Sequence, residues 1–168
     1  MIQTSERSNF LDANTREPSL AELLLPKLVQ MDVECRDWKE VVRKGTVPLE
    51  MYGYVAGRYK DAIIHNILEY GPAMVMFPGA LISHAAPTEG CRKLGVSFMS
   101  LRRPVSFHNK RYDPVRIVFT LSVLDGNRHM NALMQLFRML SDPDIREQLF
   151  QACTKEQLLK LIQRASEG

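Results

Sequence analysis

The chain has 168 residues, of which 45% are hydrophobic and 24% charged, and its formal net charge is +3. This length and balance are typical of one folded globular domain, and they exclude a disordered chain, a collagen-like fibre and a disulfide-stapled mini-domain. The small positive charge does not indicate a concentrated basic face, so no nucleic-acid partner is expected.

The first half of the chain predicts a polar leader followed by alternating helices and strands. Residues 1–18 are polar and end at Pro18, which predicts a leader outside the core. Ser19 and Glu22 form a capping box that opens a short helix, and the domain proper is expected at residues 19–168. The next expected elements are a strand at 28–33, a helix capped by Asp37, and a helix that ends at 70–72.

The second half continues the alternation. Residues 73–77 are wholly apolar, which is typical of a strand covered on both faces, and residues 115–124 are expected to form the longest strand. Apolar positions at i, i+3, i+4, i+7 and i+10 from Met130 predict an amphipathic helix. Also expected are strands at 80–82 and 94–101 and two C-terminal helices, the last capped by Thr154 with Gln157. This order predicts an α/β domain with helices on both faces of the sheet.

The cysteines and histidines give few signals of their own. Cys35, Cys91 and Cys153 are far apart and odd in number, which fits a reducing compartment better than a disulfide framework. No two of the four histidines have the i,i+4 spacing of a helical zinc site, so no metal is expected. The sequence contains neither an apolar window of membrane-spanning length nor a signal-peptide pattern, and a cytoplasmic protein is expected.

His84 is the first candidate for chemistry. It ends an apolar strand and begins the turn-rich loop at 85–90, and side chains at strand ends of α/β sheets commonly line the ligand crevice. An imidazole there could act as a general base, a metal ligand or a nucleophile that carries a phosphoryl group. The competing interpretation is a histidine that only forms a hydrogen bond at the strand edge.

His129 is the second candidate. It follows the turn at 125–127 and lies in the first turn of the helix expected from Met130, where free backbone N–H groups stabilise an anion. It would suit a second contact to a phosphate carried nearby, and the alternative is an exposed, idle histidine. Both His84 and His129 come just after an apolar strand, so they reach one crevice if those strands are parallel neighbours.

The run at 78–90, Pro-Gly-Ala-Leu-Ile-Ser-His-Ala-Ala-Pro-Thr-Glu-Gly, resembles the active-site segment of a bacterial transport family. That family is the IIA component of the phosphoenolpyruvate-dependent sugar phosphotransferase system, mannitol/fructose type. The similarity covers roughly residues 20–165. It continues through 104–107, 113–115 and 121–125 to His129 heading a helix, and 37–40 and 70–72 further resemble the ascorbate-type branch.

The resemblance implies a single three-layer domain with a mixed sheet of about five strands between helices. It also implies that His84 accepts a phosphoryl group on Nε2 from the phosphocarrier protein HPr and passes it to a cysteine of a IIB component. The membrane IIC permease would be served indirectly, His129 would steady the phosphate, and neither metal nor organic cofactor would be needed. Such transfer depends mainly on alignment and charge stabilisation.

Two positions depart from the family pattern. Ser83 stands where the family has a proline before the active histidine, and its hydroxyl could bond the phosphate. Ala86 stands where the ascorbate branch has an arginine, which removes a charged donor. Arg92 and Arg128 are the candidates to replace that charge.

Two other functions compete with the phosphohistidine carrier. A regulatory domain would keep the fold and bind partners according to the phosphorylation of His84, or would have a silent site. A Cys91 and His84 pair for acyl transfer would need a lowered thiol pKa and a third orienting group. The sequence leaves open which sugar is transported, and it leaves the oligomeric state open as well, a homodimer included.

Overall fold

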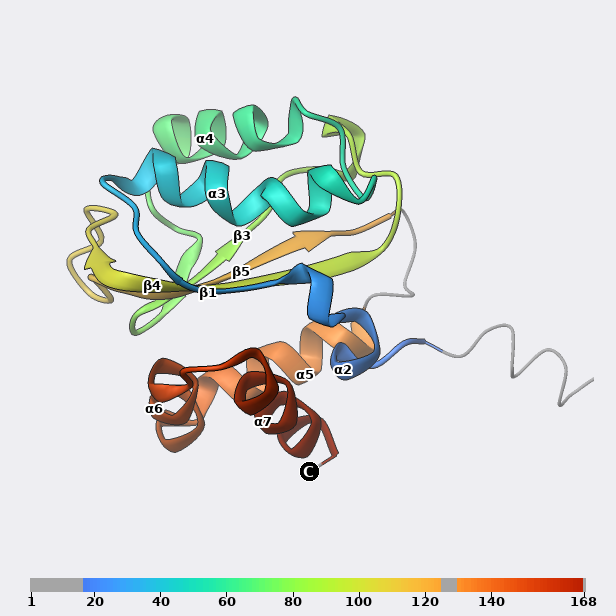
Figure 1. Ribbon diagram of the computed structural model, residues 1–168. Coiled ribbons are helices and arrows are strands. Elements are labelled where there is room, and N and C mark those ends of the chain that lie inside the picture. Colours follow the sequence, from blue (N-terminus) through green and yellow to red (C-terminus); the bar gives the residue numbers. More distant parts are fainter. Residues whose placement is uncertain (1–16, 125–129, 168) are drawn as a thin grey trace, which may run out of the picture.

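The computed structural model describes residues 17–124 and 130–167, in which a mixed five-stranded sheet lies between two layers of helices (Figure 1). The strand order is β1-β4-β5-β3-β2. The β1–β4 and β3–β5 pairs are parallel, whereas β4–β5 and β2–β3 are antiparallel. The strands are β1 (Val29–Val33), β2 (Val75–Phe77), β3 (Ala80–Ser83), β4 (Gly95–Val105) and β5 (Val115–Ser122). The leader predicted at 1–18 lies outside the described residues except for its last two positions.

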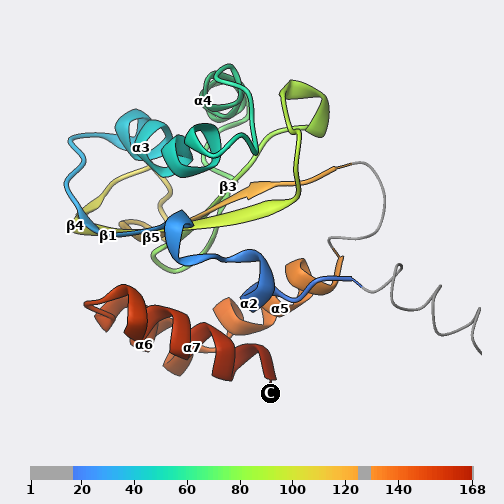
Figure 2. The same cartoon turned by 45° about the vertical axis from the view of Figure 1, so that its right-hand side comes forward.

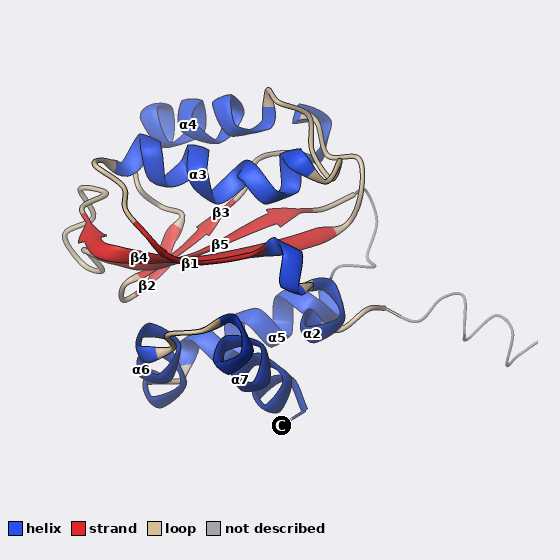
Figure 3. Ribbon diagram, viewed as in Figure 1, coloured by secondary structure: helices blue, strands red, loops and turns tan. Residues whose placement is uncertain are grey.

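The helices cover both faces of the sheet, which confirms the predicted three-layer α/β class (Figure 3). One layer consists of α3 (Trp38–Met51) and α4 (Tyr59–Tyr70). The other layer consists of α2 (Leu20–Leu23), α5 (Met130–Ser141), α6 (Pro143–Gln151) and α7 (Lys155–Glu167). Short 3₁₀ turns are η1 (Pro26–Leu28) and η2 (Pro87–Glu89). None of the helices in the described ranges combines the length and apolar composition that a membrane crossing requires.

Three predicted helix starts are confirmed by hydrogen bonds that the cap side chain accepts. The Ser19 Oγ accepts from the Glu22 amide at 3.2 Å, and the Asp37 Oδ1 accepts from the Glu40 amide at 2.9 Å. The Thr154 Oγ1 accepts from the amide of Gln157 at 3.1 Å. Each cap satisfies a backbone donor that the first helical turn leaves unpaired, and each depends only on residues three apart.

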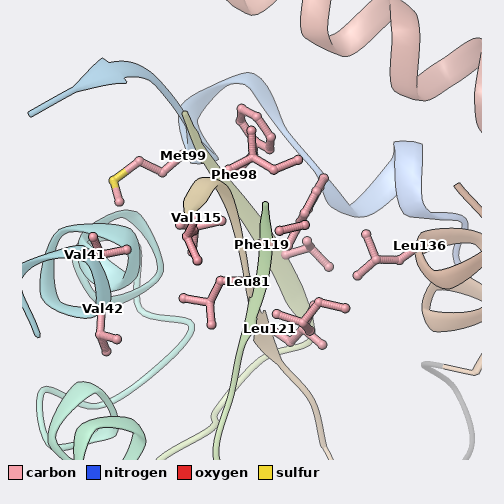
Figure 4. Close-up of a cluster of buried hydrophobic side chains, with 14 of the residues drawn as sticks. Val41, Val42, Leu81, Phe98, Met99, Val115, Phe119, Leu121 and Leu136 are labelled. Atoms are coloured by element: carbon pink, nitrogen blue, oxygen red, sulfur yellow. The ribbon is translucent and has the colours of Figure 1, made fainter. Parts of the chain in front are cut away.

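The core lies on both faces of the central strands (Figure 4). Leu81 of β3 and Phe119 of β5 are fully buried, and the Phe98 and Phe119 rings meet edge to face with their centroids 5.1 Å apart. α3 packs directly on the sheet at Gly45, where a Cβ would be in van der Waals contact with the Thr120 Oγ1 at 3.4 Å. The strand ends are thus fixed by a tightly packed interior.

Two strand predictions are wrong. The apolar run 73–77 yields only the edge strand β2, with Met76 42% exposed, because β2 has β3 as its one sheet neighbour. The longest strand is β4 with 11 residues, whereas β5 has 8. The second half of β4 carries the exposed residues Arg102 and Arg103, so its sequence lacks the apolar run that marks β5.

Candidate functional site

His84 is the first residue after β3, and its side chain is half-buried. Its Nδ1 lies 2.9 Å from the carbonyl oxygen of Ile82. A carbonyl oxygen only accepts hydrogen bonds, so Nδ1 carries the hydrogen in this contact. In the neutral ring the lone pair then belongs to Nε2, which is the nitrogen free to act as a nucleophile or ligand.

The strand arrangement on which the expected crevice depends is present in the sheet. β3 and β5 are parallel neighbours, so the condition under which the two histidines would reach one crevice holds for their strands. The loop after β3 lies on the side of the α3/α4 layer, whereas α5, the next described helix after β5, lies in the opposite layer (Figure 2). Adjacent parallel strands whose connections depart to opposite faces create the crevice in which α/β proteins bind ligands.

Two of the predicted site residues cannot be located. His129 and Arg128 both lie outside the described residues, which end at Leu124 and resume at Met130. The contribution of each therefore remains a prediction from the sequence.

Backbone contacts hold the His84 loop (residues 84–93) along a segment that we call the clamp (residues 54–59). The Tyr54 carbonyl accepts from the amides of Arg92 at 2.8 Å and Lys93 at 3.2 Å. Further along, the Ala56 amide donates to the Gly90 carbonyl at 2.8 Å. Between these two contacts, Val55 and Cys91 form an isolated β-bridge. The two segments therefore run antiparallel, and the clamp fixes the second part of the loop, residues 90–93.

Side chains of the clamp complete this anchoring. The Arg58 Nη2 donates to the Thr88 carbonyl at 3.2 Å. The Tyr59 hydroxyl, fully buried, accepts from the Ala85 amide at 3.0 Å and lies 2.6 Å from the Leu121 carbonyl. Burial raises the pKa of the Tyr59 phenol well above its ordinary value, so the hydroxyl keeps its proton. The loop after His84 is thus joined to both α4 and β5.

Gly90 is required where the loop meets the clamp. Its φ is +124°, a region that side chains rarely adopt, and a Cβ there would lie 2.9 Å from the Ala56 Cβ. Glycine permits both the backbone conformation and the close approach.

Ser83 is fully buried, with its Oγ in the interior. It pairs in register with Thr120 of β5, and neither hydroxyl has a hydrogen-bond partner among the described residues. The hydroxyl that replaces the family's proline therefore lies inside the protein rather than on the exposed side of the site.

The structure separates the remaining candidates. Arg92 has an exposed side chain and is fixed through its backbone amide. His65, a histidine outside the candidate set, is exposed on α4 with its Nε2 3.0 Å from the Glu69 carboxylate. The Cys91 thiol is half-buried beside Tyr59, where it contributes to the raised phenol pKa. In residues 17–124 and 130–167, no three His, Cys, Asp or Glu side chains are grouped so that they could hold a metal.

Tyr59 and Arg58 are the site residues that the sequence analysis missed. They lie 25 or more positions before the loop they contact, and in the sequence they look like ordinary first residues of a helix. Only the pairing of the clamp with the His84 loop gives them a place in the site.

Comparison with known proteins shows the family of the chain. The family model "Phosphoenolpyruvate-dependent sugar phosphotransferase system, EIIA 2" matches residues 22–165. The chain therefore belongs to the EIIA type 2 family of that system, whose members are phosphocarriers in sugar uptake.

Individual relatives refine the likeness. The ascorbate-specific PTS system EIIA component of Escherichia coli K12 is 32% identical over 149 residues, which cover 88% of this chain and 95% of the relative. The solution structure of the mannitol-specific cryptic phosphotransferase enzyme IIA CmtB from Escherichia coli aligns with a TM-score of 0.79 and 28% identity, over 88% of this chain and 99% of that one. The complex of enzyme IIA-mannitol with phosphorylated enzyme IIB-mannitol from Escherichia coli contains a chain of the same fold, at a TM-score of 0.72 and 19% identity. That match covers 82% of this chain and 95% of the other.

Proposed function

We propose that the Nε2 of His84 is the atom that accepts the phosphoryl group. The observation that carries this proposal is the 2.9 Å contact between Nδ1 and the Ile82 carbonyl, which leaves the lone pair on Nε2. The lone pair attacks the phosphorus of a phosphohistidine on HPr, a new N–P bond forms, and the donor's N–P bond breaks with its electron pair returning to the donor nitrogen. The Ile82 carbonyl then stabilises the positive charge that the ring acquires while Nδ1 stays protonated.

In the onward step His84 is the donor of the phosphoryl group instead of its acceptor. A cysteine thiolate of a IIB component attacks the phosphorus, the N–P bond to His84 breaks, and Nε2 recovers its lone pair. A IIB partner is supported by the fold shared with the IIA chain of the mannitol complex. His129, the residue before α5 in the sequence, would bind the phosphate oxygens during both steps, with Arg92, Arg128 or Arg58 supplying positive charge.

The substrate proposed for the whole system is ascorbate. The basis is the 32% identity to an ascorbate-specific EIIA component over 88% of the chain. The protein would act in the cytoplasm, between HPr and a IIB component that serves a membrane IIC permease. Uptake of labelled ascorbate by cells that lack their own EIIA component and express this chain tests the assignment, and uptake of mannitol alone would overturn it.

Mass spectrometry tests the acceptor directly. The parent, His84→Ala and His65→Ala are incubated with phosphoenolpyruvate, enzyme I and HPr, and their intact masses are measured. We expect one acid-labile phosphoryl adduct on the parent and on His65→Ala, whose altered side chain is exposed on α4, and no adduct on His84→Ala. A labelled His84→Ala would refute the acceptor. An unlabelled but folded parent would favour the regulatory function.

A further inference from the structure

The register of the parallel strands β3 and β5 predicts which backbone groups would form the next hydrogen bond beyond the end of β3. The Ile117 amide donates to the Gly79 carbonyl at 3.1 Å, and the register continues as far as the Ser83–Thr120 pair. In a parallel ladder every second residue of one strand makes both bonds. Counting on from Gly79, the next bonded residue beyond β3 is Ala85, whose amide would donate to the Leu121 carbonyl.

That bond is replaced by a side chain. Both groups bind the Tyr59 hydroxyl instead, the Ala85 amide at 3.0 Å and the Leu121 carbonyl at 2.6 Å. The carbonyl can only accept, so the hydroxyl donates its single proton to Leu121 and accepts from Ala85. The hydroxyl therefore occupies the position of a ladder hydrogen bond and keeps the two strands apart by one oxygen atom.

This insertion lies directly beside His84. On one side the imidazole is tied to Ile82 through Nδ1, and on the other side the next peptide is tied to Tyr59. We propose that Tyr59 is a positioning residue for the phosphoryl acceptor: its hydroxyl separates the ends of β3 and β5 and fixes the peptide that follows His84, so that the ring keeps its Nδ1 contact with Ile82 and leaves Nε2 free. The inference rests on the proposed function of His84, and it assigns to Tyr59 a role apart from contact with the phosphoryl group.

The clamp also explains why Tyr59 can hold this position. Tyr59 is the first residue of α4 and is 0% exposed, and the preceding residues Tyr54, Ala56 and Arg58 form hydrogen bonds with the His84 loop. A displaced hydroxyl would leave the Ala85 amide and the Leu121 carbonyl buried without partners, which is costly. The position of the hydroxyl is thus determined by α4, which carries Tyr59, and by its hydrogen bonds to β5 and to the His84 loop.

Tyr59→Phe is the test variant, and Tyr54→Phe is its matched control. Both remove one hydroxyl from a buried tyrosine of the clamp, but only Tyr59 bonds the chain next to His84. We expect Tyr59→Phe to lower the maximal rate of phosphoryl acceptance about 10- to 100-fold, with an unchanged KM for phospho-HPr, as a small misplacement of reacting atoms does. Tyr54→Phe should transfer at the parent rate. A Tyr59→Phe protein that is folded and transfers at the parent rate would overturn the proposal.

A readout without turnover separates this inference from the proposed function. The ¹⁵N NMR spectrum of the His84 ring reports which nitrogen carries the hydrogen, and we expect the Nδ1–H form to dominate in the parent and to lose population in Tyr59→Phe. An unchanged ring spectrum would contradict positioning even if the parent accepted no phosphoryl group. If Tyr59→Phe does not fold, the proposal is tested by the rate of hydrogen exchange of the Ala85 amide in the parent protein. Slow exchange is expected for an amide on a buried hydroxyl, and unprotected exchange would overturn the proposal.

Discussion

Two loops of this fold are each organised by one side chain that binds several polar groups, yet the two side chains come from different places. In the β4–β5 loop the Asp113 carboxylate accepts from the amides of Phe107 at 2.9 Å and Asn109 at 3.1 Å and from the Ser106 hydroxyl at 2.7 Å. All these partners lie within seven residues of Asp113. The His84 loop is held instead by Tyr59, which lies 26 residues before Ala85 and bonds Leu121 62 residues away.

The difference concerns what each loop depends on. The β4–β5 loop carries its organising carboxylate within itself, and its long-range contacts are secondary ones, in which the Asn109 Nδ2 donates to the Pro72 carbonyl at 3.1 Å and to the Val75 carbonyl at 3.3 Å. The His84 loop takes its shape from α4 and β5, so the acceptor is aligned only when the whole domain is folded. A reacting group benefits from this arrangement, because rigid elements hold it more accurately than a loop can hold itself.

The largest effect is expected from a variant that separates the His84 loop from the clamp. Gly90→Ala places a Cβ 2.9 Å from the Ala56 Cβ at a φ of +124°. We expect unfolding to become easier by about 1–3 kcal/mol and phosphoryl acceptance to fall with it. Denaturant unfolding and the labelling assay measure the two effects.

Gly53→Ala is the control for this variant. Its φ is +78° but nothing lies within 4 Å of the added Cβ, so it should cost some stability and leave acceptance unchanged. Equal loss of acceptance in both variants would show that the contact with Ala56 is irrelevant to the site.

A second, smaller effect is expected from the local loop. Asp113→Asn removes the charge and one acceptor oxygen from a carboxylate that holds two amides and a hydroxyl, which should cost about 1–2 kcal/mol of stability. Phosphoryl acceptance per folded molecule should stay at the parent value, because this loop lies at the opposite end of β5 from His84. Thermal melting and the labelling assay check both statements. A loss of acceptance without unfolding would remove the contrast between the loops.

Alkaline pH should weaken the contacts that Tyr59 makes with the His84 loop. The pKa of Tyr59 is raised by burial, so the folded state holds the phenol proton to a higher pH than the unfolded chain, whose tyrosines titrate near about 10. The stability contributed by this group is complete below about pH 10 and is lost as the pH rises from there toward the folded pKa. Over that window the unfolding free energy of the parent should fall about 1.4 kcal/mol per pH unit more steeply than that of Tyr59→Phe.

The control here is Tyr70→Phe, which removes an exposed phenol and should keep the slope of the parent. Urea unfolding at a series of alkaline pH values gives the slopes. Parallel slopes for the parent and Tyr59→Phe would mean that the hydroxyl can ionise without loss of the clamp.

The sequence predicts what neighbouring residues determine. The caps at Ser19, Asp37 and Thr154 could be predicted because each hydrogen bond spans three residues. The place of His84 directly after β3 could be predicted because it follows an apolar run, whereas the place of His129 stays a prediction because that residue lies outside the described ranges.

The sequence does not predict what distant segments decide together. Whether the run at 73–77 is covered on both faces depends on its being an edge strand, which the run itself does not encode. The role of Tyr59 depends on the register of β3 with β5 and on the placement of α4 above both. The apolar pattern of the sequence specifies neither the order of the strands nor their register. The contacts of Tyr59 with Ala85 and Leu121 therefore could not be predicted from the sequence.

The smallest effect is expected from the exposed arginines, and it separates two ways of holding the loop. Arg58 is anchored by its guanidinium on the Thr88 carbonyl, whereas Arg92 is anchored by its backbone amide on Tyr54 and leaves its side chain exposed. Arg58→Gln should therefore weaken the loop by no more than about 0.5 kcal/mol, the usual range for surface changes, and Arg92→Gln should leave it unchanged. Hydrogen exchange of the Ala56 amide, which donates to Gly90, measures the loop in both variants. If Arg92→Gln slows phosphoryl acceptance while that amide stays protected, its side chain acts on the phosphoryl charge. If only Arg58→Gln slows acceptance, the charge that Ala86 lacks is supplied from the clamp.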